Sequence, residues 1–423
     1  MVRIAIISDL HLGFGRGMER EEDPFVAAER AFEKVEDEDV DMIVLAGDIF
    51  DSRLPRPEHW SRFMRLLSEM KNGRSVEISR TKGREEVPEE SIRGLPVLAI
   101  HGTHERRANG MKNSIEALED AGFLVHMHCS SVELNIDGEK VGVHGMSGVP
   151  EKYSKGVLKK WGPEPFEDAY NIFMLHQDLE QYIYNPASPP ELGLEDLPGG
   201  FDLYVSGHIH CKNKEAVKDG HFIIPGSLIP TQQRRKEFET PKGFYVAETE
   251  TNKVQFIEID PPRKLVYEKI DAGGSNPKEI KDSITAKIEK LLQGGFENKP
   301  LIRIKLTGEL DSGLNPGDID LSKIREKYKN DAIITVLKDL DEEGMEGAEK
   351  IKTHEDRMLS VEEIGMRILR KNLEGNGSGI SPEPIFEDLV EGNLNSALKK
   401  LKEGHNKDEE KEKTKTGEWW KGY

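Results

Sequence analysis

Apolar residues in the first 250 positions fall into short continuous runs, separated by stretches in which they recur with helical spacing. The runs are VRIAIIS, DMIVLAG, LPVLAIHG, YNIFMLH and FDLYVSG, and they read as buried strands. One amphipathic helix is predicted between the first two runs, from the spacing of Phe25, Ala28, Phe32 and Val35. Buried strands that alternate with helices indicate an α/β sheet covered on both faces.

The pattern changes after residue 205, where we expect strands without helices. HFIIPGS, KGFYVAETE and NKVQFIEID predict antiparallel strands joined by turns. The charged segment from Lys71 to Ser91 precedes the third run, and we expect it to form a surface loop. Residues 1–260 are therefore predicted to form one layered domain with mixed α/β architecture.

A second, smaller unit is predicted over residues 262–340, after a linker at Asp260 to Lys264. KLVYEKI, LIRIKL and AIITVL have the composition of strands. Helices are expected between them, the first with Ile280, Ile284 and Ile288 on one face and the second from Leu321 to Tyr328. The order is β-α-β-α-β.

The last part of the chain has a different composition. Residues 355–404 predict helices, the first of which begins at Ser360 with Glu363 in a capping-box position. Residues 405–423 are highly charged and are expected to be disordered. Trp419 and Trp420 near the end either pack back on the protein or dock on a partner, and we favour docking.

Composition excludes several classes of protein. No apolar run approaches the length of about 18 residues needed to cross a membrane, so no membrane association is expected. The N-terminus lacks the layout of a signal peptide. Two cysteines, Cys129 and Cys211, argue against a disulfide framework and favour a reducing compartment, so we expect a cytoplasmic location.

The net charge of −19 argues against nucleic-acid binding through a generally basic surface. Basic residues nevertheless cluster locally. The clusters are Arg53 with Arg56, Arg106 with Arg107, and Arg234 with Arg235 and Lys236. If these clusters surround one cleft, they could hold phosphate groups despite the overall charge.

Residues suited to metal binding follow the ends of five predicted strands. They are Asp9 and His11, then Asp48, then His104, then His176, and finally His208 and His210. In open α/β sheets, ligands bind beyond the carboxyl ends of the strands. Carboxylates and imidazoles are suitable ligands for manganese, iron or zinc. The sequence therefore predicts a metal site at these strand ends, whereas His126, His128, Cys129 and His144 are expected to be structural.

The order of these motifs resembles the calcineurin-like metallophosphoesterase superfamily. The segments GDIFDSRLPRP, PGSLIPTQ and KGFYV look like the SbcD/Mre-type nucleases of double-strand-break repair. The resemblance implies a two-sheet α/β/β/α sandwich over residues 1–260 and a small α+β DNA-capping domain over 262–340. It also implies that helices in residues 355–404 bind a coiled-coil ABC-type ATPase.

The resemblance also assigns roles to individual residues. Asp9, His11, Asp48 and His210 would hold one metal, and Asp48, Thr103, His176 and His208 the second. His104 is similar to the family's catalytic histidine, which protonates the leaving oxygen. Two Mn²⁺ ions per subunit are expected, with Mg²⁺, Fe²⁺ or Zn²⁺ as alternatives. Phosphate or DNA contacts are expected from Asp51, Arg53, Arg106, Arg107, Arg234 and Arg235.

Two positions depart from the family pattern. Thr103 replaces an asparagine that binds the second metal, and a hydroxyl is a poorer ligand than an amide carbonyl. The second metal is then bound more weakly, takes a water in that place, or recruits His101. Asp51 stands where some relatives have a histidine that orients the exonuclease substrate.

The function implied by the resemblance is that of a manganese-dependent nuclease with 3′-to-5′ exonuclease activity on duplex DNA and single-strand endonuclease activity. It would process DNA ends as a homodimer joined to the ATPase. Two alternatives remain open: a metallophosphoesterase for small phosphodiesters or phosphomonoesters, and a DNA-end-binding scaffold whose catalysis is weakened by Thr103.

The apolar stripe at Trp60, Phe63, Met64 and Leu67 serves either dimerisation or packing on its own sheet.

Overall fold

The computed structural model describes most of the chain up to residue 341 and short parts beyond it. The described residues are 1–70, 76–84, 87–108, 110–183, 190–232, 234–310, 316–341, 366, 369–370, 382–390 and 400. Beyond residue 341 one short helix is described, α10 (Glu383–Val390), in which Ile385 and Phe386 are buried. Of the helix predicted from Ser360, only Met366, Leu369 and Arg370 are described, and they are helical. The tail at 405–423 with Trp419 and Trp420 lies outside the described residues.

The first sheet has the strand order β13-β12-β1-β2-β4-β5. Its strands are β1 (Arg3–Ile7), β2 (Met42–Ala46), β4 (Val97–Ile100), β5 (Val125–His126), β12 (Gly243–Glu248) and β13 (Lys253–Glu258). The strands β1, β2, β4 and β5 run parallel, whereas β12 and β13 are antiparallel additions at one edge. The carboxyl ends of the four parallel strands therefore meet at one edge of the sheet.

The second sheet has the order β10-β11-β9-β8-β7-β6-β3. Its strands are β3 (Glu77–Lys82), β6 (Ser130–Ile136), β7 (Glu139–Met146), β8 (Tyr170–Leu175), β9 (Leu203–Ser206), β10 (Asn213–Val217) and β11 (Gly220–Ile224). The central strands β7, β8, β9 and β11 are parallel, and the outer strands pair antiparallel.

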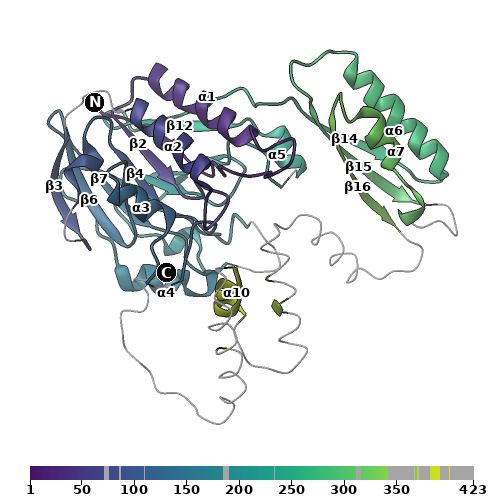
Figure 1. Ribbon diagram of the computed structural model, residues 1–423. Helices are drawn as coiled ribbons and strands as arrows, with labels where there is room; N and C mark the ends of the chain where they lie inside the picture. Colours follow the sequence, from purple (N-terminus) through teal and green to yellow (C-terminus); the bar gives the residue numbers. More distant parts are fainter. Residues whose placement is uncertain are drawn as a thin grey trace, which may run out of the picture.

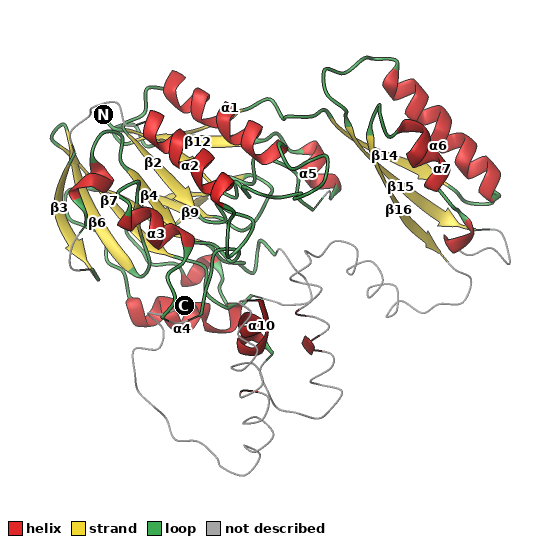
Figure 2. Ribbon diagram, viewed as in Figure 1, coloured by secondary structure: helices red, strands yellow, loops and turns green. Residues whose placement is uncertain are grey.

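The two sheets pack face to face between layers of helices (Figure 2). Successive residues of β1 point to opposite faces. Ile4 and Ile6 accordingly lie in the core between the sheets with Val143 and Met174, and Ile7 lies in the core under the helices. The predicted two-sheet α/β/β/α sandwich is therefore confirmed.

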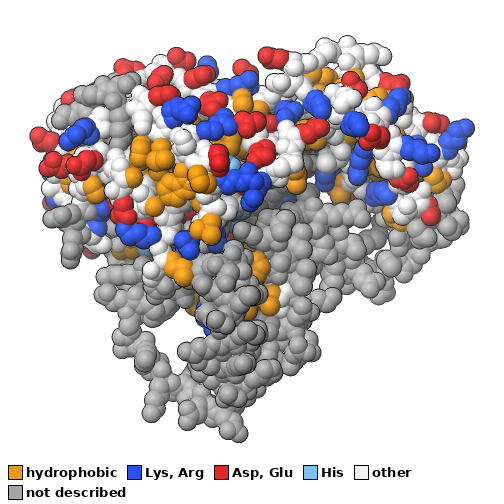
Figure 3. Space-filling view, viewed as in Figure 1, with side chains coloured by type: hydrophobic (Ala, Val, Ile, Leu, Met, Phe, Trp, Pro, Cys, Tyr) orange, Lys and Arg blue, Asp and Glu red, His pale blue; other side chains and the backbone are white. Residues whose placement is uncertain are grey.

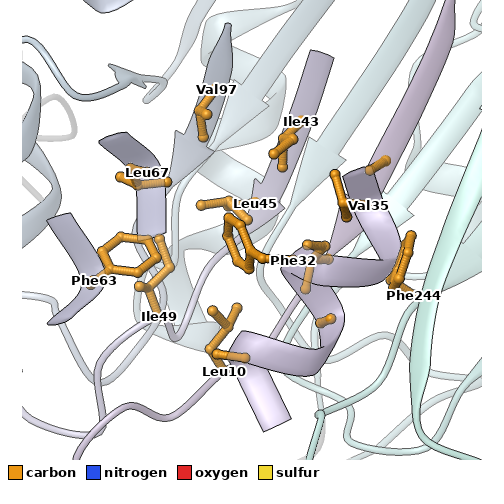
Figure 4. Packing of buried hydrophobic residues seen from close by; sticks show 14 of the residues in the cluster. Leu10, Phe32, Val35, Ile43, Leu45, Ile49, Phe63, Leu67, Val97 and Phe244 are labelled. Atoms are coloured by element: carbon orange, nitrogen blue, oxygen red, sulfur yellow. The ribbon is translucent and has the colours of Figure 1, made fainter. Parts of the chain in front are cut away.

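Three helices cover the first sheet: α1 (Asp23–Asp37), α2 (Pro57–Glu69) and α3 (Ser114–Asp120). In Figure 4, Phe32 of α1 lies beside Leu45 of β2, and Phe63 of α2 lies beside Ile49 in the same core. Complete burial of one such phenylalanine contributes on the order of 2–3 kcal/mol. The other side of the sandwich is covered by α4 (Glu151–Trp161). Its Val157 and Leu158 belong to a separate core with Phe173 and Leu175 of β8.

Three local predictions were wrong. The strand β11 joins the second sheet beside β9 instead of pairing with β12. A short helix, α5 (Arg235–Glu239), lies in the region expected to lack helices. The strand β3 and the 3-10 helix η1 (Glu89–Ile92) lie within the segment expected to be a surface loop. Pairing with β6 supplies the backbone partners of β3, and its own mostly exposed side chains give no apolar signal.

The smaller unit contains a three-stranded parallel sheet with the order β14-β15-β16, and its helices lie together on one side (Figure 1). Its elements are β14 (Leu265–Asp271), α6 (Pro277–Leu292), β15 (Leu301–Glu309), the 3-10 helix η3 (Pro316–Asp318), α7 (Ser322–Tyr328) and β16 (Ile333–Asp341). Ile280, Ile284 and Ile288 of α6 pack against Ile302 and Ile304 of β15. The predicted β-α-β-α-β order is confirmed.

In the described part of the chain, every helix is too short or too polar to pass through a membrane. On the face seen in Figure 3, acidic and basic side chains are interspersed instead of separated into one acidic field.

Candidate metal centre

The predicted ligand residues all lie in loops that directly follow parallel strands. Asp9 and His11 follow β1, Asp48 follows β2, and Thr103 and His104 follow β4. His176 follows β8, and His208 and His210 follow β9. The first three loops belong to the first sheet and the last two to the second, so the residues converge where the carboxyl ends of both sheets meet.

Four of these residues adopt the left-handed backbone conformation that side chains other than glycine rarely take. The φ angles are 52° at Asp9, 48° at His11, 49° at Asp48 and 76° at His208. Such conformations cost on the order of 1 kcal/mol each and persist only where the surroundings enforce them. Backbone bonds from Asp9 N to Gly47 O (3.0 Å) and from His11 N to Asp48 O (3.0 Å) hold the two loops together.

Glycines allow the loops to approach one another closely. A Cβ atom added to Gly102 would lie 2.1 Å from Asp48 Oδ1, and one added to Gly47 would lie 2.4 Å from His176 Nδ1. Neither contact is sterically possible, so both positions require glycine. The sequence pattern suggested a turning role for these glycines, and the structure adds this close approach.

One group of candidate ligands consists of Asp9, His11 and His210. His11 Nε2 and His210 Nε2 lie 3.1 Å apart, at 4.0 Å and 3.8 Å from Asp9 Oδ1. All three side chains are buried. Two imidazole nitrogens and one carboxylate oxygen that converge in this way form a donor set suited to a transition-metal ion.

A second group consists of Asp48, His176 and His208. His176 Nδ1 donates a hydrogen bond to Ala46 O (2.8 Å), which leaves Nε2 without a proton in the neutral ring. That Nε2 lies 3.1 Å from Asp48 Oδ2. Burial would lower the pKa of His176, but Asp48 raises it to about 9, so without a metal ion the ring holds a proton that a bound cation would displace.

Asp48 belongs to both parts of the site. Together with His11 and His104 it forms a third close group, and it accepts a hydrogen bond from His104 N (2.9 Å). Burial alone would raise the pKa of Asp48, but the neighbouring His176 and His104 hold that pKa well below its usual range. The carboxylate is therefore ionised and lies between the two ligand groups.

Outer partners orient two of the ligand histidines. His11 Nδ1 lies 2.9 Å from Asp51 Oδ1, and His210 Nδ1 lies 2.7 Å from Thr231 Oγ1 and 3.4 Å from Glu237 Oε1. Burial would raise the pKa of Glu237, but the contact with His210 and the charge of Lys242 lower it to about 2. Partners of this kind fix the tautomer and the orientation of a ligating ring.

His104 lies beside the two groups and remains reachable, because 23% of its side chain is exposed. Its Nδ1 lies 3.2 Å from Asp51 O. Burial would lower the pKa of His104, but Asp48 and Asp51 raise it to about 10. Without bound cations the ring is therefore protonated at neutral pH.

Thr103 and His101 are placed differently from one another. Thr103 Oγ1 lies 3.4 Å from Asp48 Oδ2, next to the second group. His101 Nδ1 is engaged with His126 Nε2 at 2.9 Å and with Asn113 Nδ2 at 3.3 Å. His126 and His128 therefore pack around His101 in a separate histidine cluster.

Two supporting residues were not singled out from the sequence. Glu105 is buried and accepts hydrogen bonds from Phe50 N and Gly102 N, both at 2.7 Å, so it joins the loops after β2 and β4. Its position next to His104 in the GTHE motif was a usable signal. Glu237 had no such signal, because nothing in QQRRKE indicates that the glutamate turns inward.

The basic residues expected to contact phosphate groups flank the same loops. Arg53 is partly exposed two residues after Asp51, and Arg106 and Arg107 are partly exposed just after Glu105. Arg234 and Arg235 are exposed at the start of α5, the helix that carries Glu237. Arg235 pairs with Glu239 (2.7 Å).

Comparisons with known proteins agree with this arrangement. Curated relatives include the DNA double-strand break repair protein Mre11 of Methanopyrus kandleri, with 27% identity over 292 residues, covering 62% of this chain and 58% of the relative. The Mre11 of Saccharolobus solfataricus is 26% identical over 325 residues, covering 73% and 76%. The repair protein mre-11 of Caenorhabditis elegans is 25% identical over 287 residues, covering 58% and 39%.

The chain thus spans less than two thirds of the Methanopyrus and Caenorhabditis relatives. Residues 2–212 match the family model described as calcineurin-like phosphoesterase, and this range contains every candidate ligand. The chain belongs to the calcineurin-like phosphoesterase family and, within it, is similar to the Mre11 repair proteins.

Proposed function

We propose that this chain is a two-metal phosphodiesterase that cleaves DNA at broken ends. The observation that carries the proposal is the position of Asp48 between two groups of metal-type ligands, with His104 beside it. Asp9, His11, Asp48 and His210 would hold one divalent cation, and Asp48, His176 and His208 the other, with Thr103 adjacent. We propose Mn²⁺ as the physiological ion.

Divalent cations bound there would supply positive charge that stabilises the phosphate in the transition state and activates water for attack. The chain's own residues would do the rest. Asp48 stays ionised and contributes its carboxylate between the two ligand groups. His104 has its Nδ1 held by Asp51 O, which leaves Nε2 as the nitrogen that passes a proton to the leaving oxygen.

DNA is the proposed substrate because relatives that are similar over more than half of this chain are named double-strand break repair proteins. Arg53, Arg106 and Arg107 follow residues of the metal centre in the chain and could bind phosphate groups. The unit at 262–340 would cap the DNA, and residues 355–404 would bind a coiled-coil ABC-type ATPase. A homodimer with both 3′-to-5′ exonuclease and single-strand endonuclease activity is the form we propose.

A nuclease assay with metal controls tests this proposal. The full chain is incubated with end-labelled duplex DNA and with a nitrophenyl phosphodiester, in Mn²⁺, Mg²⁺, Zn²⁺ or EDTA. DNA degradation in Mn²⁺ that EDTA abolishes is expected. His104→Ser should abolish cleavage and leave DNA binding nearly unchanged. Cleavage of the nitrophenyl ester without any cleavage of DNA would instead favour a small phosphodiester as the substrate.

Thr103 favours one alternative, a DNA-end-binding scaffold with weakened catalysis, because its hydroxyl replaces a stronger amide ligand. The variant Thr103→Asn separates the two functions. If the wild type is inert with every metal and the variant cuts DNA, the scaffold is supported. Comparable cleavage by both proteins supports the nuclease.

A further inference from the structure

Asp51 lies at the end of a loop whose position is set by the main chain. The loop after β2 runs beside the loop after β1, and hydrogen bonds continue the pairing of these two strands. They join His11 N to Asp48 O (3.0 Å), Leu12 N to Ile49 O (2.9 Å) and Asp51 N to Leu12 O (3.1 Å). Asp51 is therefore held beside His11 by a backbone ladder.

The Asp51 side chain contacts the buried ring of His11. Asp51 Oδ1 lies 2.9 Å from His11 Nδ1. Because a carboxylate accepts, Nδ1 is the donor, and the lone pair of His11 is then on Nε2, which faces His210 Nε2 and Asp9. The ring also packs edge-on against His104 and His210, at centroid distances of 4.9 Å and 4.8 Å.

The main chain of Asp51 makes a different contact. Its carbonyl oxygen lies 3.2 Å from His104 Nδ1, whereas its Oδ1 lies 3.7 Å from that nitrogen. The side chain thus holds the candidate metal ligand His11, and the backbone holds the candidate proton donor His104. A side-chain substitution removes the first contact and leaves the second in place.

His11 and His176 differ in their outer partners. His176 has a neutral carbonyl, Ala46 O, whereas His11 has a carboxylate. A carboxylate partner makes the ring a more basic and better oriented ligand, and loss of such a partner weakens metal binding by about 10- to 100-fold. The Asp51 side chain contacts His11 of the first group, so we expect its effect on the first metal site.

We propose that Asp51 is a positioning residue that sets the affinity of the first metal site through His11, an inference that rests on the proposed metal centre. It does not act by contacting the substrate, which its position in the family pattern suggested. Only 26% of the side chain is exposed, and a carboxylate there would repel a phosphate group. Its oxygen already serves the ring of His11.

Metal titration of the full-length chain tests this role. Mn²⁺ is titrated into metal-free wild type, Asp51→Ala, Asp51→Asn and the control Asp282→Ala, which removes an exposed aspartate of α6. Binding is followed by calorimetry and by the electron paramagnetic resonance signal of free Mn²⁺. We expect one site of Asp51→Ala to weaken by about 10- to 100-fold, with the other site and the control unchanged.

Asp51→Asn is expected to fall between wild type and Asp51→Ala, by about 3- to 10-fold, because its amide oxygen still accepts from His11 but carries no charge. If Asp51→Ala does not fold, the Mn²⁺ affinity of Asp51→Asn decides the question. Raising Mn²⁺ by the factor lost in affinity should restore most of the DNA cleavage by Asp51→Ala, and the remaining loss reflects the lower pKa of His104 without the Asp51 charge. A substrate contact would instead raise the KM for DNA at every Mn²⁺ concentration.

Unchanged Mn²⁺ affinity in Asp51→Asn and Asp51→Ala would overturn the inference while leaving the proposed function intact. The converse outcome is also distinguishable. If wild type binds two Mn²⁺ ions, Asp51→Ala binds one of them weakly and neither protein cuts DNA, Asp51 keeps its role and the nuclease proposal fails. Absence of Mn²⁺ binding by wild type would overturn both.

Discussion

Individual residues at the metal centre are held in conformations that their own preferences oppose. Asp9, His11 and Asp48 have positive φ angles, and Gly47 and Gly102 pack against ligand side chains with no room for a Cβ atom. Strained backbone conformations of this kind are concentrated at functional sites, where contacts with the surrounding structure enforce them. The ligand loops therefore tolerate little change even at residues that donate no ligand.

Gly102→Ala tests this steric requirement. Its Cβ would lie 2.1 Å from Asp48 Oδ1, so Asp48 must move. We expect the apparent Mn²⁺ affinity and DNA cleavage each to fall by at least about tenfold. Gly156→Ala in α4 is the matched control, because its Cβ meets no atom within 4 Å. Equal cleavage by the two variants would show that Asp48 need not stay in place.

His144 predicts an acid sensitivity that is independent of the metal centre. It is fully buried on β7, and burial lowers its pKa to about 4, against about 6.5 in an unfolded chain. Between these two pKa values His144 is protonated in the unfolded chain and neutral in the folded one. The folded state therefore keeps its full free energy of unfolding above about pH 6.5 and loses part of it as pH falls toward 4. The loss at pH 4.5 is about 2–3 kcal/mol.

Urea unfolding of wild type and His144→Gln at pH 7 and pH 4.5 measures this effect. The variant is expected to be less stable at pH 7, because His144 Nε2 bonds to Asn171 Oδ1 (3.1 Å). Its free energy of unfolding should nevertheless fall less between the two pH values. Parallel losses in the two proteins would mean that His144 does not titrate in this range.

Elements with a strong apolar pattern could be predicted from the sequence, and elements defined by their partners could not. The runs that became β1, β2, β4, β8 and β9 are buried on both faces and read clearly. The strand β3 has mostly exposed side chains, and pairing with β6 defines it. The hairpin of β6 and β7 carried a usable signal, the turn at Asp137 and Gly138, where both φ angles are positive.

The same distinction applies to the candidate site. Convergence of the ligand loops follows from strand direction alone, so the sequence sufficed to predict it. The contact between Asp51 and His11 depends on how two neighbouring loops pair, and the inward turn of Glu237 depends on the placement of α5. Such contacts join residues that no local pattern relates.

The helix α6 offers a test at the scale of one element. Asn276 Oδ1 accepts from Lys278 N and Glu279 N, and Glu279 bonds back to Asn276 N, which completes a capping box. Asn276→Ala should destabilise the unit at 262–340 by about 1 kcal/mol in urea unfolding. The exposed control Asp282→Ala should change the free energy of unfolding by less than about 0.5 kcal/mol. Equal effects of the two changes would exclude a capping role.

At the scale of the whole molecule, the small unit is joined to the large one by defined contacts. Arg263 donates to Asp23 Oδ1 (2.8 Å) and to Glu19 O (2.6 Å), at the N-terminal end of α1. Phe238 of α5 meets Tyr267 of β14, with ring centroids 6.1 Å apart. The same short helix carries Glu237 beside His210, so α5 connects the small unit to the metal centre.

Arg263→Ala should loosen this junction. We expect faster hydrogen exchange at the amides of residues 260, 263 and 264, with no change in the buried strand β1. Duplex DNA cleavage should fall more than hydrolysis of a nitrophenyl phosphodiester, because only the larger substrate would reach the small unit. Lys287→Ala, a change on the far helix α6, is the control. Identical losses with both substrates would place the effect of Arg263 at the metal centre itself.

The central claim is that residues from five strand ends hold two cations on either side of Asp48. The most direct measurement is the anomalous scattering of manganese in crystals of the full chain grown with Mn²⁺. We predict two peaks that share Asp48, one also bound by Asp9, His11 and His210 and the other by His176 and His208. A single peak, or peaks away from Asp48, would contradict the account.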